Sequence, residues 1–394
     1  MSLNKHLLLK FFIVIAVLLA VLSQEPNYKN VLPLDQLCSI AWMIVVAYMC
    51  LSPLEMKLNV NSTMGLFAVQ ICIYLSMTAL KAIVYKTDLI IGITDFIPIP
   101  LMIYCVAYNY MALQTEGIES ALQIIAWIYS IASVLLSILC ILNSNMALSD
   151  WMDAQMYVYG VGKNAIGQVL GAGTFISFFY LSGDSIVKKI VKYVATIIMV
   201  AGLLFVQCRT VILGVTVIMI VWFVWFYKPN KSYKLLLVFM ISMVIIAILN
   251  NAEIMSIIEK ALFLNKYEGQ GINSYSSGRI NQWANGIKAF MQDPIFGTSY
   301  YVDNYYINSL ANNGFIVFLM RTVLFFYVAA QNIRCSIRSA NLKILIVAVT
   351  VLELFVSLLE AFPPYGPGVA TMMFWFLSGV AHYISSYEGV NESE

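Results

Sequence analysis

The stretch ESALQIIAWIYSIASVLLSILCI, residues 119–141, carries one charged side chain, Glu119, at its first position. An α-helix rises 1.5 Å per residue, so about 20 apolar residues cross the ~30 Å hydrocarbon core of a bilayer. Because this stretch is long and apolar enough, we expect a membrane-spanning helix here. The same reasoning, applied outward along the chain, decides the fold.

The composition extends this expectation to the whole chain. Of 394 residues, 61% are hydrophobic and 11% are charged, whereas soluble proteins have about 45–50% and about 25%. This excludes a soluble enzyme, a secreted disulfide scaffold and a nucleic-acid binder. We predict an all-α polytopic membrane protein of about twelve transmembrane helices. The expected spans are 7–23, 36–53, 62–80, 89–112, 119–141, 164–182, 190–207, 211–227, 235–250, 314–332, 343–362 and 368–386.

Three parts follow from these spans. Residues 1–250 hold the first nine helices, residues 251–313 form one large loop, and residues 314–394 hold the last three helices and a short tail. The first span has an alternative interpretation, because Phe11 to Leu22 resembles the apolar region of a signal peptide. Cleavage there would leave every later orientation unchanged.

The short connections give the orientation. Twelve spans put three basic connections on the same side as both termini, and the positive-inside rule makes that side cytoplasmic. The protein is therefore expected in the bacterial inner membrane, with the large loop in the periplasm. Lys81 and Lys86 lie on the periplasmic side and weaken the contrast locally. The basic connections contain Lys188, Lys189 and Lys192; Lys228, Lys231 and Lys234; and Arg334, Arg338 and Lys343.

The Cys and His residues of the sequence give little support for metal or thiol chemistry. The seven Cys lie mostly in apolar runs and never as C-x-x-C, so we interpret them as small core residues. The two His, His6 and His382, lie near the chain ends. We predict no metal site and no cofactor.

The large loop contains an expected amphipathic helix. Apolar residues recur at helical spacing from Ile280 to Met291, after Ser276-Ser277-Gly278-Arg279 and before Asp293-Pro294. We expect a serine cap and a helix that rests on the membrane surface. Its N-terminus, with a guanidinium in the first turn, suits a phosphate. The alternative is a capped surface helix with Arg279 in water.

Arg209 is the second cation on the same side. It follows a long apolar span and immediately precedes another, so it lies in a hairpin at the outer membrane boundary. A cation there needs an anionic partner, and a lipid headgroup is the simplest one. Together with Arg279, it can instead form a clamp for the pyrophosphate of a lipid-linked substrate.

Polar and aromatic residues alternate after the amphipathic helix. Asp303, Asn304 and Asn308 offer groups that bond sugar hydroxyls, and the Tyr rings among them can stack on sugar faces. The alternative is an interfacial aromatic belt. The tyrosines are Tyr300, Tyr301, Tyr305 and Tyr306.

Several ionisable residues lie within expected spans. Arg321 and Glu353 should be ~10–14 Å deep, counted from the outer ends of their helices at 1.5 Å per residue. Their similar depth allows an ion pair, either structural or part of a substrate pathway. Glu360 lies two turns above Glu353 on the same predicted face, so it can point into a substrate cavity. Asp95 is a further residue of this kind.

These residues carry a resemblance to a known family. Ser277-Gly278-Arg279 with Trp283, Pro294 and Gly297, then Asp303-Asn304-x-Tyr306 and Gly314, resembles the loop signature of O-antigen and capsule polysaccharide polymerases and the related O-antigen ligases. Two other patches agree with it: Lys163-Asn164-Ala165-Ile166-Gly167 and Cys208-Arg209-Thr210. The patches follow the family order over roughly residues 160 to 314.

The resemblance implies a polymerase. It would join oligosaccharide repeat units carried on undecaprenyl diphosphate at the periplasmic face, without a nucleotide sugar. A chain-length regulator and a flippase are the implied partner proteins. Ligases carry a His beside the loop Asn, but Asp303 stands there in this sequence, which favours the polymerase. A ligase and a flippase or other transporter are the alternatives.

Our hypothesis for this reaction gives the residues roles. Arg209 and Arg279 would bind the donor pyrophosphate, and Asp303 or Glu360 would take the proton of the acceptor hydroxyl. These four are the expected catalytic residues. The expected substrate-binding residues are Asn164, Ser277, Gly278, Trp283, Asn304, Tyr305, Tyr306 and Arg321.

Overall fold

The structure is a computed structural model that describes residues 5–25, 34–51, 59–86, 99–113, 117–142, 163–181, 185–226, 278–361, 363–365 and 371–391. Within these ranges every regular element is helical, as expected for an all-α protein. Helices occupy eleven of the twelve predicted segments. The remaining segment, 235–250, lies outside the described residues, as do Asp95 and Ser277.

The helices keep the predicted order. Five of them, in the part of the chain that is described, are long and apolar enough to cross a membrane: α4, α7, α10, α16 and α17. The bounds are α1 (Lys5–Leu22), α3 (Leu34–Leu51), α4 (Ser62–Tyr85), α6 (Ile99–Ala112), α7 (Ile118–Leu142), α9 (Lys163–Phe175), α10 (Ile186–Val206), α11 (Arg209–Val221), α15 (Arg279–Gln292), α16 (Tyr305–Arg334), α17 (Ala340–Ser357) and α18 (Met372–Asn391). Short π-helical turns, Ile176–Tyr180 and Trp222–Phe226, extend α9 and α11.

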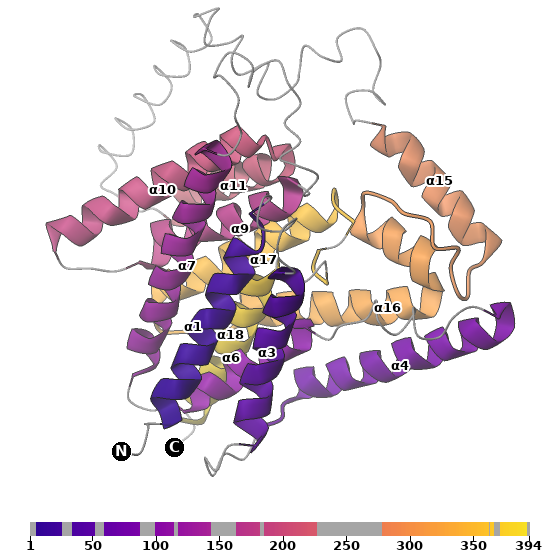
Figure 1. The fold of residues 1–394 in the computed structure, drawn as a ribbon, viewed down its shortest axis with the longest axis horizontal. Coiled ribbons are helices and arrows are strands. Elements are labelled where there is room, and N and C mark those ends of the chain that lie inside the picture. Colours follow the sequence, from indigo (N-terminus) through magenta and orange to yellow (C-terminus); the bar gives the residue numbers. More distant parts are fainter. Residues whose placement is uncertain are drawn as a thin grey trace, which may run out of the picture.

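The core is a helical bundle from which one helix, α4, projects. Helices α1, α3, α6, α7 and α18 run side by side, and α18 packs extensively on α6 (Figure 1). Helices α9, α10, α11 and α17 pack together beside them. Helix α4 extends away from the bundle and contacts α16 (Figure 1). Large side chains such as Trp42, Trp375 and Tyr104 fill the core.

Two helix boundaries differ from the sequence prediction in ways that matter for the site. Helix α17 ends at Ser357, so Glu360 lies beyond the helix rather than inside a span. Helix α16 begins at Tyr305 and bends at Gly314, whose φ of 74° and ψ of 176° are not helical. A Cβ at Gly314 would collide with the backbone of Ile295, so only glycine allows this close approach.

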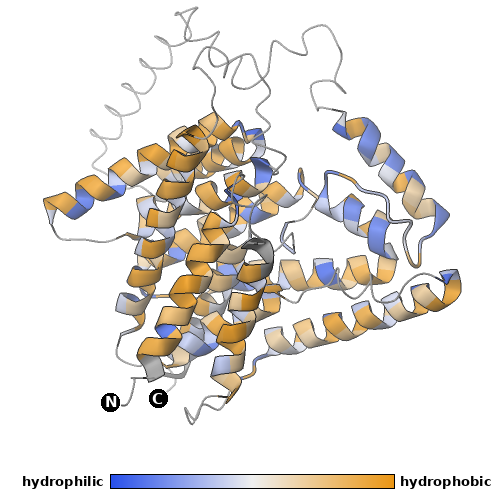
Figure 2. Cartoon of the chain, in the orientation of Figure 1, coloured by the Kyte–Doolittle hydropathy of each residue, from blue (hydrophilic) through white to orange (hydrophobic). Residues whose placement is uncertain are grey.

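Helix α15 is the amphipathic helix of the large loop. Its N-cap is Gly278 in a left-handed conformation, without a side-chain hydrogen bond, so the expected serine cap is wrong. Trp283 and Phe290 are half-buried, whereas Ile280 and Ile287 are exposed. Figure 2 shows that α15 and the loop after it are far more hydrophilic than the bundle.

Candidate active site

Glu360 is the centre of the candidate site. Its side chain is buried, and both carboxylate oxygens accept hydrogen bonds. Oε1 accepts from Arg279 Nη2 at 3.0 Å and from Thr210 Oγ1 at 3.1 Å, and Oε2 accepts from Asn164 Nδ2. Arg279 and Glu360 thus form an ion pair. A buried carboxylate needs this number of partners, because desolvation is costly without them.

The ends of four elements meet at this carboxylate. Asn164 is in the first turn of α9, Thr210 in the first turn of α11, and Arg279 is the first residue of α15. Glu360 follows the end of α17. The predicted spans place all four ends on the same side, the one that the sequence analysis expects to be periplasmic. Segments far apart in the sequence are therefore brought to one point.

Glycine allows α9 and α11 to approach closely enough for this. A Cβ at Gly167 would lie 2.5 Å from the Cys208 sulfur, and one at Gly171 would lie 2.7 Å from a Val211 methyl group. Cys208 Sγ also donates to Asn164 Oδ1 at 3.6 Å. The two sequence patches around residues 163–167 and 208–210 are therefore in direct contact.

Cations gather around the ion pair. Burial lowers the pKa of the Lys163 ammonium, and the positive charge of Arg209 lowers it further. Burial raises the pKa of the Glu360 carboxyl above its ordinary value, while the Arg279 charge opposes that rise. Arg209, Arg279 and Glu360 all act electrostatically on Lys163, so these four charged groups lie close together. Such a cluster suits an anionic ligand.

Asp303 lies at the edge of this cluster, and its negative charge acts on Glu360. Tyr301 donates its hydroxyl hydrogen to Asp303 Oδ1 at 2.9 Å. The indole of Trp283 donates to the Asp303 carbonyl at 3.0 Å, and the Asp303 amide donates to Gln282 Oε1 at 3.2 Å. Helix α15 therefore fixes the backbone of Asp303 while the carboxylate faces a tyrosine.

Asn304 connects the start of α16 to the end of α17. Its Oδ1 accepts from the Ile307 amide at 3.0 Å, which caps α16, and its Nδ2 donates to the Leu358 carbonyl at 2.8 Å. Asn308 donates to the Ala361 carbonyl at 3.4 Å in the same way. The side-chain amides of Asn304 and Asn308 therefore bond backbone carbonyls before and after Glu360 and hold its segment in place.

The four loop tyrosines have different surroundings. Tyr305 is buried among aromatic rings, including Phe325 and Tyr365, and packs in the core. Tyr306 bonds Ser357 Oγ at 3.2 Å. Tyr300 and Tyr301 are exposed, at 37% and 47%. These two are the most exposed of the four.

The structure does not contain the ion pair between Arg321 and Glu353 that the sequence analysis considered. The Arg321 guanidinium lies over the rings of Tyr74 and Tyr365, at 5.1 and 5.6 Å from their centroids. Glu353 is buried, and its Oε1 has no hydrogen-bond partner. The depth argument fixed only the height of each residue along its helix, and the side chains face different neighbours.

The structure thus joins several residues that the sequence analysis singled out. Arg279, Glu360 and Asn164 are in contact, Gly278 caps the helix of Arg279, and Trp283 supports Asp303. Sequence reasoning missed the contributions of Lys163, Cys208 and Thr210, although all three stand next to predicted residues. Their positions in the two short patches were the available signal.

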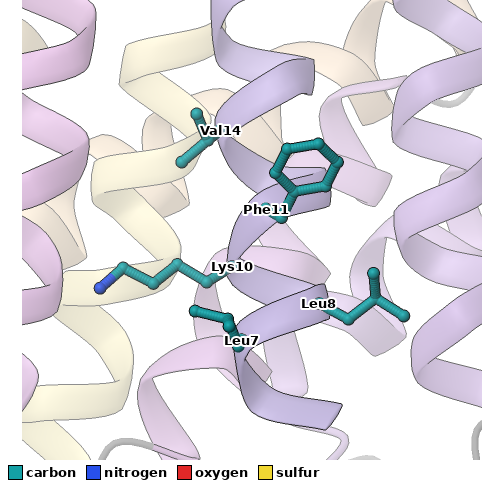
Figure 3. Close-up of a pocket in the computed structure, with 5 residues that line it drawn as sticks. All are labelled: Leu7, Leu8, Lys10, Phe11 and Val14. Carbon is teal, nitrogen blue, oxygen red and sulfur yellow. The ribbon is translucent and has the colours of Figure 1, made fainter. Parts of the chain in front are cut away.

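Two surface hollows lie elsewhere. One is an apolar depression on α1 lined by Leu7, Leu8, Lys10, Phe11 and Val14, whose side chains splay apart (Figure 3). The other lies between the start of α7, the connection from α16 to α17, the start of α17 and α18, and it is lined partly by Glu119, Arg338 and Tyr387. Neither contains a residue of the Glu360 cluster.

Comparison with known proteins gives a family for the part of the chain that holds most of the site. Residues 194–317 match the family model described as O-antigen ligase. This range includes Arg209, Thr210, Arg279 and Asp303, and Asn164 and Glu360 lie on either side of it. No curated protein matches the chain. Residues 194–317 are therefore similar to the O-antigen ligase family, which is consistent with the resemblance carried by the sequence patches.

Proposed function

We propose that this protein is a polysaccharide polymerase. It joins oligosaccharide repeat units carried on undecaprenyl diphosphate at the periplasmic face of the inner membrane. A hydroxyl of the acceptor unit attacks the anomeric carbon of the donor chain. The bond from that carbon to the phosphate oxygen breaks, and undecaprenyl diphosphate leaves with the electron pair. The hydroxyl proton passes to a carboxylate.

The observation that carries this proposal is the Arg279–Glu360 ion pair with Asn164 and Thr210 bound to the same carboxylate. It unites three of the patches that resemble the polymerase and ligase family. Members of the O-antigen ligase family are glycosyltransferase-like enzymes that act on lipid-linked sugars. The apolar helices are consistent with a substrate whose carrier lies in the bilayer.

The donor diphosphate fits the cationic side of the cluster. Arg279 offers a guanidinium at the start of α15, where free backbone amides and the helix dipole also favour an anion. Arg209 and Lys163 lie close by. A diphosphate that binds Arg279 competes with Glu360 for it and so releases the carboxylate. Each contact to the leaving group can lower the barrier by ~2.7–4 kcal/mol.

The acceptor fits the acidic and aromatic side. Glu360, released from Arg279, or Asp303 takes the hydroxyl proton. The exposed rings of Tyr300 and Tyr301 lie next to Asp303 in the chain, and Tyr301 bonds its carboxylate. They offer stacking surfaces for the acceptor sugar.

A ligase is the second candidate, because the matching family model bears that description. A ligase would transfer the finished chain to a different lipid acceptor. The residue beside Asn304 is Asp303, where ligases carry a His. His382 lies in another part of the fold, bonded to Tyr104 at 2.6 Å. This pattern favours the polymerase.

Chain-length analysis of the surface polysaccharide tests the proposal. A strain that lacks the gene should still attach single repeat units to its surface lipid but make no long chains. Loss of a ligase would instead leave polymer on undecaprenyl diphosphate, and loss of a flippase would leave no units at the surface. The purified protein in liposomes, given lipid-linked repeat units alone, should produce polymer and free undecaprenyl diphosphate.

Variants connect that activity to the site. Cells with Arg209→Ala or Arg279→Ala should show single repeat units at normal protein levels, since removal of one such contact lowers the rate about 10²–10³-fold. Lys288→Ala is the matched control, because this exposed residue lies on the same helix as Arg279. Long polymer from both arginine variants would refute the diphosphate site.

A further inference from the structure

The periplasmic end of α4 is attached to the large loop by a cation. Lys81 Nζ donates to the carbonyl oxygens of Phe296 and Gly297 at 3.2 and 3.0 Å, and to Ser299 Oγ at 3.4 Å. Three acceptors satisfy all three N–H bonds of an ammonium. Lys81 was an exception to the charge pattern in the sequence, and these contacts explain its position.

A tyrosine one turn later makes a second attachment. The Tyr85 hydroxyl donates to Asp293 Oδ2 at 2.8 Å, and its ring meets the Phe296 ring edge-on at 5.8 Å. The other oxygen of Asp293 accepts from the Phe296 amide at 3.0 Å. Lys81 and Tyr85, on one face of α4, therefore hold the turn that directly follows α15.

These contacts stand out because the second half of α4 has little other packing. The first half is fixed by its own contacts, from Ser62 to Tyr327 and from Thr63 to His382, and the buried residues of α4 all lie between Thr63 and Tyr74. The helix extends away from the bundle (Figure 1), and Lys81 and Tyr85 attach its second half to the loop.

Helix α15 connects the turn held by Lys81 and Tyr85 to the site around Glu360. Helix α15 has 14 residues, which corresponds to about 21 Å at 1.5 Å per residue. Asp293 follows its last residue, and Arg279 is its first. Gly286, midway along α15, allows a close approach, since an added Cβ would lie 2.5 Å from a Val302 methyl group and 2.7 Å from one of Ile307. A displacement of the held end should tilt α15 about this contact and move Arg279.

We propose that Lys81 and Tyr85 are positioning residues that hold the end of α15 and thereby keep Arg279 in reach of Glu360. This inference rests on the proposed function, because its effect is read through the transfer reaction. It assigns α4 a role that burial in the bundle does not explain. The two side chains set the geometry of the donor site from its far end.

The test compares Lys81→Met, which removes the ammonium and keeps the aliphatic stem, with Lys81→Arg, which restores donors. Lys86→Met is the control, because it removes a cation from the same helix end. The purified proteins in liposomes are given lipid-linked repeat units over a range of pH. Lys81→Met should lower the polymerisation rate roughly tenfold to a hundredfold, the effect of misplacement by about 1 Å. Lys81→Arg should recover most of it.

The pH profile separates positioning from simple loss of stability. Asp303, Tyr301, Lys163, Cys208, Thr210 and Asn164 also face Glu360. They remain in Lys81→Met, whereas Arg279 moves away. The Arg279 charge lowers the pKa of Glu360, so the acid limb of the profile should move to higher pH. Tyr85→Phe, which removes a single hydroxyl, should cause a smaller shift in the same direction.

Two results would overturn the inference while leaving the proposed function intact. One is a normal rate and profile in Lys81→Met and Tyr85→Phe. The other is a lower rate with an unchanged acid limb, which would mean general destabilisation. If the wild-type protein makes no polymer while Arg279 and Glu360 variants are equally inert, the proposed function itself fails.

Discussion

Arg279 and Glu360 are 81 residues apart in the chain and meet through a single 3.0 Å contact from Nη2 to Oε1. The Arg279 side chain is 21% exposed and the Glu360 side chain 6%. A pair with one side open to water can be separated by an incoming anion at lower cost than a fully enclosed one. On the proposed function, the pair would act as a switch between an empty site and a site that holds a diphosphate.

Glu360→Gln should separate proton transfer from donor binding. The amide keeps the shape, and its oxygen can still accept from Thr210, but its NH2 group cannot accept from Asn164. Because the amide cannot take up a proton, kcat should fall about 10²–10⁴-fold. Arg279 is no longer neutralised, so the KM for the donor should stay the same or fall. Initial rates of polymer formation at varied donor concentration measure both. Glu119→Gln, in the first turn of α7, is the control, and an unchanged kcat in Glu360→Gln would exclude Glu360 as the base.

The pH dependence of the rate should report the same carboxyl. Burial raises the pKa of Glu360 above its ordinary 4.5, and a base acts only when it is deprotonated. The rate should therefore be full above the raised pKa and fall as the pH drops through it. In Arg279→Gln the charge that lowers the pKa of Glu360 is gone. The acid-side loss of the residual activity should therefore begin at a higher pH than in the wild type. Plots of kcat/KM against pH measure this limb.

Matched variants make that result specific. Lys288→Gln, on an exposed face of the same helix, should leave the limb where the wild type has it. An acid limb at the same pH in wild type and Arg279→Gln would show that a different group titrates. Asp303 would then be the first candidate, because its charge also acts on Glu360.

The sequence predicted most of the helices and several site residues, but not their pairing. Apolar runs locate helices because the bilayer demands about 20 such residues, wherever they face. The facing direction depends on packing. Arg321 and Glu353 were matched by depth, yet Arg321 stacks on Tyr74 and Tyr365. Glu360 contacts Arg279 because α17 ends at Ser357 and the residues after the helix turn toward α15.

The missed residues have a similar explanation. Thr210 and Lys163 are ordinary residues for the first turn of a helix, so their types carry no signal by themselves. Their importance comes from Gly167, which lets Cys208 approach α9 and places both helix starts at one carboxylate. That approach involves two segments about 40 residues apart, and periodicity within either segment does not show it.

Gly314→Ala should strongly destabilise the protein. The residue has a φ of 74°, and an added Cβ would meet the Ile295 carbonyl, so α16 and the turn after α15 must separate. A non-glycine residue held in such a conformation costs about 1–3 kcal/mol before any collision. The thermal midpoint in detergent, followed by size-exclusion chromatography of heated samples, should fall by several degrees.

Gly65→Ala provides the contrast. Gly65 lies within α4, and nothing lies within 4 Å of an added Cβ. Alanine is the better helix former by about 1 kcal/mol, so this variant should be as stable as the wild type or more so. Equal thermal midpoints for Gly314→Ala and the wild type would mean that the bend at Gly314 tolerates a side chain.

Asn304 makes two bonds with opposite polarity. Its oxygen accepts from the Ile307 amide and its nitrogen donates to the Leu358 carbonyl. Asparagine and aspartate can both cap a helix, but only asparagine can donate to that carbonyl. The two functions can therefore be removed separately, which makes this residue a probe of how Glu360 is held.

Asn304→Asp should keep the cap and lose the attachment to Leu358, two residues before Glu360, because a carboxylate repels the carbonyl oxygen. We expect a modest loss of stability and a clear fall in kcat. Asn304→Ala loses both bonds and should lower stability by about 0.5–2 kcal/mol for the cap alone. Asn61→Ala is the control, since Asn61 also caps a helix, α4, and also donates, to the Tyr104 hydroxyl at 2.8 Å. It should lower the thermal midpoint without a comparable fall in kcat. If Asn304→Asp polymerises at the wild-type rate, the Leu358 attachment does not position Glu360, and the carboxylate depends on Arg279, Thr210 and Asn164 alone.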